Sequence, residues 1–130
     1  MRLVFVAALT LLSACVNTQV TELGPPVSRP SLQPLNVAIY RTVEQVKEPY
    51  DEVALIKVTG PPVFNDELMH KEMRERAAKL GANGLILQGV VEPSEGRKTA
   101  AMWAPGFVQA ERVGTAIAIF VRAKEPEPAK

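Results

Sequence analysis

The chain has 130 residues, 11 prolines and one cysteine, and its formal net charge at neutral pH is +1. Its basic residues are scattered, so it lacks the electrostatic footprint of a nucleic-acid-binding protein and the polybasic cluster that draws proteins to anionic lipids. With a single cysteine, an internal disulfide framework is excluded as the means of holding the fold.

The N-terminal segment has the layout of a secretory signal. Arg2 supplies a positive charge, residues 3–12 are apolar, and small residues follow. Ten apolar residues are too few to span a bilayer, which needs about 20 in a helix. The sequence therefore predicts a signal peptide over residues 1–14.

The run Leu12-Ser13-Ala14-Cys15 resembles the lipobox of bacterial lipoproteins. In that class the cysteine sulfur receives a diacylglyceryl group, and cleavage leaves the cysteine as an acylated N-terminus. The resemblance implies lipidation at Cys15, and Val16 in the following position, rather than Asp, implies an outer-membrane location facing the periplasm. An ordinary signal peptide with an incidental cysteine is the alternative.

Prolines and polar residues dominate the next segment. Residues 15–36 are predicted to be the lipidated cysteine and a proline-rich tether, because such segments favour extended polyproline II; about 20 residues would reach as far as ~60 Å. Residues 124–130 are predicted to form a polar tail. The domain between them, residues 37–123, is large enough for one hydrophobic core.

The apolar periodicity of this domain predicts strands at residues 37–42, 53–59, 85–92 and 114–122. It also predicts a helix that begins at Asn65 or Asp66 and ends at Gly81. The expected fold is a single small α+β domain, a mixed four-stranded sheet with one helix packed on one face. Residues 93–113 are expected to hold a loop or an irregular hairpin with some ordered structure.

The last predicted strand has two different faces. Gly114, Ala116 and Ala118 form a small-residue face, on which we expect the helix to lie. Ile117 and Ile119 lie on the opposite face and need cover, either from the loop around Trp103 or from another protein.

Two passages carry a resemblance to known families. Residues 77–87 (AAKLGANGLIL) resemble the helix-to-strand passage of the YbjQ-type domain, also described as a heavy-metal-binding domain. Together with residues 90–96 and 113–119, they resemble the outer-membrane sensor lipoprotein of the Rcs envelope-stress phosphorelay. That sensor's folded domain is stapled by cysteines, which this chain lacks, so the resemblance favours a shared architecture over shared signalling.

The candidate metal ligands are few. Asp66 and His70 stand at i, i+4 with Met69 and Met73 as soft neighbours, but a tight site needs three or four ligands. We therefore expect no metal and no other cofactor. No nucleophile elbow, zinc-protease motif or phosphate-binding glycine loop occurs in the sequence, so we expect that the protein is not an enzyme.

The aromatic residues of the loop are the best interaction candidates. Trp103 and Phe107 flank Ala104-Pro105-Gly106, a turn suited to displaying both rings. Tryptophan is favoured at binding hot spots. The rings would cover the sheet within the chain, contact a protein partner or contact the membrane. The candidate partner-binding residues are Trp103, Phe107, Ile117 and Ile119.

These expectations together favour a lipid-anchored cell-envelope protein that acts as a non-catalytic binding module, sensor-like or accessory to an envelope complex. It is held to the membrane through its N-terminal lipid, and its partner is another envelope protein. A self-associating structural lipoprotein is the second hypothesis, and a metal or small-ligand carrier is the third.

Overall fold

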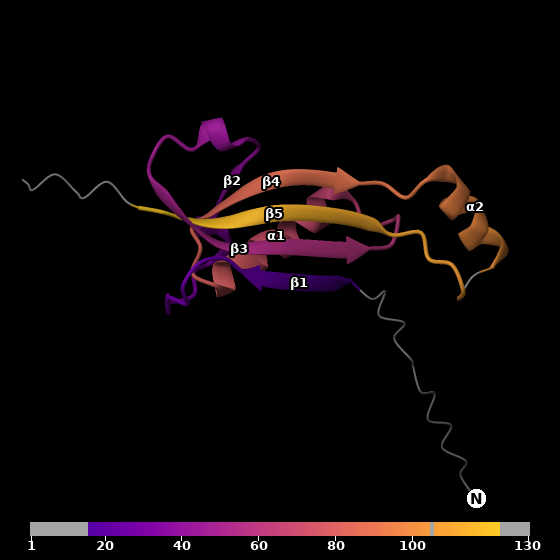
Figure 1. Ribbon diagram of the computed structural model, residues 1–130, viewed down its shortest axis with the longest axis horizontal. Coiled ribbons are helices and arrows are strands. Elements are labelled where there is room, and N and C mark those ends of the chain that lie inside the picture. Colours follow the sequence, from indigo (N-terminus) through magenta and orange to yellow (C-terminus); the bar gives the residue numbers. More distant parts are fainter. Residues whose placement is uncertain (1–15, 105, 123–130) are drawn as a thin grey trace, which may run out of the picture.

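The computed structural model describes residues 16–104 and 106–122 (Figure 1). The predicted signal peptide, Cys15 and the predicted polar tail lie outside the described residues. The elements in chain order are β1 (Asn17–Glu22), the short 3₁₀ turn η1 (Pro34–Asn36), β2 (Ala38–Tyr40), a second 3₁₀ turn η2 (Val43–Gln45), β3 (Tyr50–Gly60), α1 (Asp66–Lys79), β4 (Gly84–Val91), α2 (Glu95–Trp103) and β5 (Arg112–Val121).

One mixed sheet organises the described residues, with the strand order β1-β3-β5-β4-β2. β3 and β4 are both antiparallel to the central β5, so they run in the same direction on either side of it, and β2 is parallel to β4. α1 lies against one face of this sheet (Figure 1). The α+β class is confirmed, but the details differ, because the described residues form a sheet of five strands and two α-helices.

α1 begins and ends where the sequence predicts. The side-chain Oδ1 of Asn65 accepts a hydrogen bond of 2.9 Å from the backbone N–H of Leu68, which caps the first turn. Gly81 follows the helix with a φ of +76°, the left-handed conformation that glycine adopts without steric cost.

The small-residue face of β5 receives α1, as expected. Ala116 and Ala118 are fully buried together with Met69 and Met73 of the helix. A Cβ atom added to Gly114 would lie only 2.6 Å from the Cε of Met73. Small residues on β5 therefore make room for the two methionines, which fill the space between the layers.

The opposite face of β5 is covered by a segment that the sequence did not suggest. Ile119 is fully buried in a second cluster that includes Ile86, against which Tyr40 and Tyr50 pack. These tyrosines border the loop between β2 and β3. The expectation that the Trp103 loop or another protein covers Ile119 is therefore wrong. Ile117 lies two residues before Ile119 on the same face of β5, and it is half-buried against the same cluster.

The expectation of an extended proline-rich tether is wrong for residues 17–22, which form the edge strand β1. They pair with β3 along its outer edge, and the Oγ1 of Thr18 donates a 3.1 Å hydrogen bond to the Oε1 of Glu72 on α1. The stretch Thr18-Gln19-Val20-Thr21 is rich in β-branched residues, which favour strands even when they are mostly polar. The nearby prolines obscured this local preference.

Residues 23–36, which we call the strap, follow β1 and also contact the domain. The N–H of Leu23 donates to the carbonyl of Val53 (2.9 Å), and the N–H of Leu32 donates to the carbonyl of Ala78 (2.8 Å). The guanidinium carbon of Arg29 lies 4.9 Å from the centre of the Phe120 ring. Prolines prevent a regular ladder here, but the remaining N–H groups and side chains still bind the strap to the body of the domain.

α2 is a helix where a loop or hairpin was expected. The Oγ of Ser94 caps its first turn, accepting from the N–H of Arg97 at 3.3 Å. α2 has no buried residue and projects beyond the sheet (Figure 1). Neither helix of the described residues is long and apolar enough to cross a membrane.

The register divides the sheet into two ends. At one end Asn17, Thr59, Val113 and Val91 lie in one row across four strands, next to α2. We call this the α2 end. The opposite end, where β1 leads into the strap and β3 begins at Tyr50, is the strap end. β3 spans 11 residues at ~3.3 Å per residue, so the two ends are roughly 30 Å apart.

Candidate binding surfaces

The α2 end exposes three large apolar side chains, those of Met102, Trp103 and Phe107, with exposed fractions of 81%, 85% and 94%. We call them the apolar tip. The carbonyl of Ala104 accepts from the N–H groups of Phe107 and Val108, both at 3.1 Å, and this turn brings Phe107 back toward the end of α2. Pro105 lies outside the described residues.

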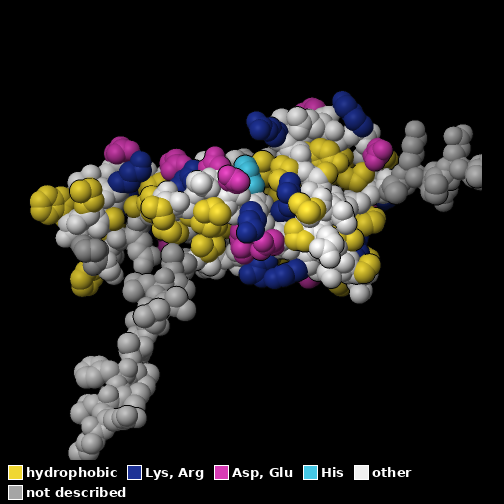
Figure 2. Space-filling view, turned by 180° about the vertical axis from the view of Figure 1, so that it is seen from behind, with side chains coloured by type: hydrophobic (Ala, Val, Ile, Leu, Met, Phe, Trp, Pro, Cys, Tyr) yellow, Lys and Arg dark blue, Asp and Glu magenta, His cyan; other side chains and the backbone are white. Residues whose placement is uncertain are grey.

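Further exposed apolar residues surround the tip. Val91 ends β4 at the α2 end, and Val63 lies between β3 and α1 at the same end; both are well exposed. Hydrophobic side chains are visible at this end of the molecule in the space-filling view, as they are over much of the same face (Figure 2). Burying a side chain such as Phe107 or Met102 would contribute about 1.5–3 kcal/mol, so this concentration of exposed side chains is a candidate interaction surface.

Arg112 fixes the base of this projection. Its side chain is only 11% exposed, forms ion pairs with Asp66 and Glu92, and donates from Nη1 to the carbonyl of Phe64 at 2.6 Å. The hydrogen bonds to Glu92 and Asp66 raise the pKa of Arg112, which stays charged. These bonds tie the starts of α1 and β5 to the end of β4, so α2 projects from a braced base.

A second bond shapes the return from α2 to β5. The Nε of Arg97 donates to the carbonyl of Gln109 at 2.9 Å, across the loop that carries Phe107. Lys98 pairs with Glu95 one turn earlier on α2, at 2.8 Å, and this bond raises the pKa of Lys98. The charged residues of α2 thus bond within the projection, whereas the side chains of the apolar tip are exposed.

The pair considered for a metal has other contacts. Asp66 is bonded to Arg112, and Met69 and Met73 are buried in the core. His70 and Asp66 line a small cavity of about 310 Å³ together with Arg112. Within residues 16–104 and 106–122, no group of three His, Cys, Asp or Glu side chains is placed to hold an ion.

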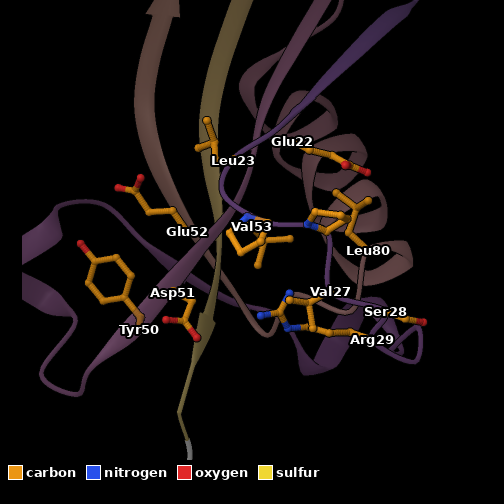
Figure 3. Close-up of a pocket in the computed structure, with 12 residues that line it drawn as sticks. Glu22, Leu23, Val27, Ser28, Arg29, Tyr50, Asp51, Glu52, Val53 and Leu80 are labelled. Atoms are coloured by element: carbon orange, nitrogen blue, oxygen red, sulfur yellow. The ribbon is translucent and has the colours of Figure 1, made fainter.

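The strap end contains a larger cavity, of about 760 Å³, between the strap and the start of β3 (Figure 3). Val53, Val27 and Leu80 gather around its middle, whereas Tyr50 and Glu52 lie to one side. The residues that line it are Glu22, Leu23, Pro25, Pro26, Val27, Ser28, Arg29, Tyr50, Asp51, Glu52, Val53 and Leu80.

Carboxylates outnumber cations in the lining of this cavity. Glu22, Asp51 and Glu52 contribute acidic groups, and Arg29 contributes the basic one. The Nη2 of Arg122 donates to Asp51 at 2.6 Å and thereby lowers the pKa of that carboxyl. An apolar middle with an acidic rim suits a ligand that combines an apolar side chain with a basic group.

The structure brings together only some of the residues singled out in the sequence. Trp103 and Phe107 lie on one exposed turn, which agrees with the predicted display of both rings. Ile119 is buried beneath Tyr40, so it belongs to the core. Cys15 lies outside the described residues.

Sequence reasoning missed the strap-end cavity altogether. Its walls come from the strap and from β3, which the sequence treated as a tether and a separate strand. The paired hydrogen bonds that dock the strap involve backbone groups, whose partners no residue pattern specifies.

No protein-family model matches the chain, and no curated protein matches it either. Among solved structures, the crystal structure of a Francisella virulence factor, FvfA, is similar, with a TM-score of 0.54 and 12% identity. The likeness covers 79% of this chain and 96% of that one. At this identity it shows a shared fold alone. The resemblance to the Rcs sensor and to the YbjQ-type domain therefore remains a prediction.

Proposed function

We propose that the chain is a lipid-anchored protein of the bacterial outer membrane that acts as a non-catalytic binding module. It is held through Cys15 and binds a periplasmic segment of another envelope protein in the strap-end cavity. The role is sensor-like or accessory to an envelope complex, and it involves no cofactor.

The position of the predicted lipid supports an orientation. Cys15 precedes the first residue of β1, Asn17, by two positions, so covalent geometry keeps their Cα atoms within roughly 7 Å. Asn17 pairs with Thr59 at the α2 end. Acyl chains on Cys15 therefore hold the α2 end against the bilayer and point the strap end away from it.

The observation that carries the proposal is the cavity of about 760 Å³ at the end remote from the predicted lipid. It faces the periplasm in this orientation. Its apolar middle, around Val27 and Val53, and its acidic rim favour an extended peptide with an apolar side chain next to Lys or Arg. Such a ligand complements the surplus of carboxylates.

Photo-crosslinking in living cells tests this binding. A photoreactive amino acid replaces Val27, which lines the cavity and is 55% exposed, or, as the matched control, Val43, which is 48% exposed and lies outside the cavity lining. We expect a discrete adduct with an envelope protein from Val27 and none from Val43. Equal adducts from both positions, or none from Val27, would contradict the proposal.

The free edge of β1 favours self-association as the second candidate function. β1 is the outermost strand, and its outer backbone edge has no partner strand among the described residues. Unpaired strand edges are templates for pairing with another chain. This function predicts a defined oligomer in sedimentation at micromolar concentration, which Gln19→Pro on β1 disrupts. A monomeric wild-type protein would count against it.

A further inference from the structure

We infer that the apolar tip inserts into the interfacial region of the lipid bilayer, next to the acyl chains on Cys15. The inference deepens the proposed function and depends on the acylation of that cysteine. It assigns Met102, Trp103 and Phe107 to lipid contact rather than to a protein partner.

The geometry of the α2 end carries the inference. Asn17, Thr59, Val113 and Val91 form one row across the sheet, and neighbouring strands are ~4.8 Å apart. The start of β1 therefore lies only about 14 Å across the sheet from the strand that leads into α2. Figure 1 shows α2 beyond this same end. A lipid attached two residues before Asn17 brings this row, and the helix beyond it, to the bilayer surface.

The side chains at the tip have the chemistry of an interfacial contact. Tryptophan concentrates at membrane–water interfaces, and Phe and Met enter the boundary between headgroups and acyl chains. Trp103 and Phe107 are among the most exposed side chains of the described residues. Lys98 bonds to Glu95, and Arg97 bonds to the carbonyl of Gln109, so these charges have partners within the projection.

The charge of the projection is compatible with this contact. Residues 92–112 contain three acidic residues and three basic residues, so their formal net charge is zero. The basic residues are Arg97, Lys98 and Arg112, and the acidic residues are Glu92, Glu95 and Glu111. No net repulsion from an anionic bilayer opposes the approach. Apolar insertion supplies the affinity, and the nearby acyl chains supply proximity.

The same geometry disfavours a protein ligand for the tip. The acyl chains leave little space between the α2 end and the bilayer, and a folded partner would have to enter that space. Arg112 bonds to Glu92, which follows β4, so the chain that leads into α2 starts from a fixed position at this end of the sheet. The lipid surface is the partner that is always within reach.

The unique tryptophan makes the test direct, since the chain contains a single Trp. The full acylated protein is reconstituted into vesicles of phosphatidylethanolamine and phosphatidylglycerol with brominated acyl chains, which quench a nearby indole. We expect Trp103 to lose most of its fluorescence and its emission to shift to the blue. In the matched control, Trp103→Phe with Leu35→Trp, the indole moves to an exposed position on η1 near the strap end. We expect no quenching there.

A second pair of variants tests the contact itself. Met102→Glu with Phe107→Glu should restore most of the lost Trp103 fluorescence, whereas Gln88→Glu, at an exposed position on β4, should not. Mass spectrometry of the same protein reports whether Cys15 carries its lipid. An acylated protein whose Trp103 stays unquenched overturns the inference and leaves the proposed anchoring intact. A protein adduct at Trp103 in cells, with no lipid quenching, would identify a protein ligand instead. An unmodified Cys15 overturns the anchoring as well.

Discussion

The two ends of the sheet differ in how their backbone groups and apolar side chains are covered. At the strap end, polar side chains and a docked segment satisfy the backbone: the amide of Asn83 donates to the carbonyl of Val121 (2.9 Å) and accepts from its N–H (2.6 Å). At the α2 end, Trp103 and Phe107 stay exposed. The strap end combines bonded backbone groups with the proposed peptide-binding cavity, whereas the α2 end presents exposed rings that lie outside the core.

This difference predicts that the bonded groups of the strap end contribute to folding and that the apolar tip does not. Substitutions at the strap end should change the free energy of unfolding, because they alter buried or bonded groups. Substitutions at the apolar tip should change attachment and leave folding alone. The predictions below test this separation.

Gly81→Ala should have the largest effect on stability among the substitutions outside the buried core. Gly81 has a φ of +76°, and an added Cβ would clash with the Cβ of Arg29 and lie 2.8 Å from the carbonyl oxygen of Pro30. The left-handed conformation and the displaced strap together should lower the free energy of unfolding by about 2–4 kcal/mol. Urea unfolding followed by circular dichroism measures it.

Gly96→Ala is the matched control, at the exposed start of α2. No atom lies within 4 Å of a Cβ added there, so the stability should stay unchanged or rise by up to about 1 kcal/mol. If Gly81→Ala were as harmless as Gly96→Ala, the strap would not be docked against the end of α1.

Asn83→Ala should have the next largest effect. The Asn83 side chain bonds to both the N–H and the carbonyl of Val121, as a neighbouring strand would. The substitution removes both hydrogen bonds and leaves these two backbone groups without that partner. We expect a loss of about 1–3 kcal/mol in the same unfolding experiment. The exposed Asn36 serves as the control, and equal losses from Asn36→Ala and Asn83→Ala would contradict this role.

The sequence predicted the parts of the fold that depend on local pattern. The cap at Asn65, the stop at Gly81 and the small-residue face of β5 all follow from residue size and spacing. Asparagine often adopts a left-handed turn, but no residue other than glycine has a positive φ among the described residues. Asn83 instead bonds to Val121, which is 38 residues away, and no local pattern encodes such a partner.

The candidate surfaces were predictable to different degrees. Trp103 and Phe107 stand out in the sequence because of their type, although the helix that displays them was missed. The strap-end cavity was hidden because proline content suggested a tether. Each proline removes one backbone N–H donor, but it does not prevent neighbouring residues from donating. The N–H groups of Leu23 and Leu32 donate to the domain and hold the strap against it.

Acid should weaken the strap end slightly. The hydrogen bond from Arg122 lowers the pKa of Asp51 below its ordinary value of 3.8. Because the carboxyl pKa is lower in the folded state than in the unfolded state, ionised Asp51 stabilises the fold at pH values above the unfolded-state pKa. This stabilisation is lost as the pH falls through the folded-state pKa. Unfolding measured from about pH 5 downward should show a shallower acid decline in Asp51→Asn than in the wild type. The effect should be small because the pair is open to solvent. A steeper decline in the variant would contradict this sign.

The smallest effect on stability should come from the apolar tip. Trp103→Ser with Phe107→Ser should leave the free energy of unfolding within about 0.5 kcal/mol of the wild type, because both rings are exposed and leave no cavity when removed. Ile119→Ala, on the buried side of β5, should cost about 2–5 kcal/mol in the same experiment. A large loss from the tip variant would mean that the rings pack on the domain in solution, so they could not serve as a free contact surface. An unchanged free energy of unfolding, together with weaker binding to lipid vesicles, would mean that the two rings contribute to contacts outside the chain and not to folding.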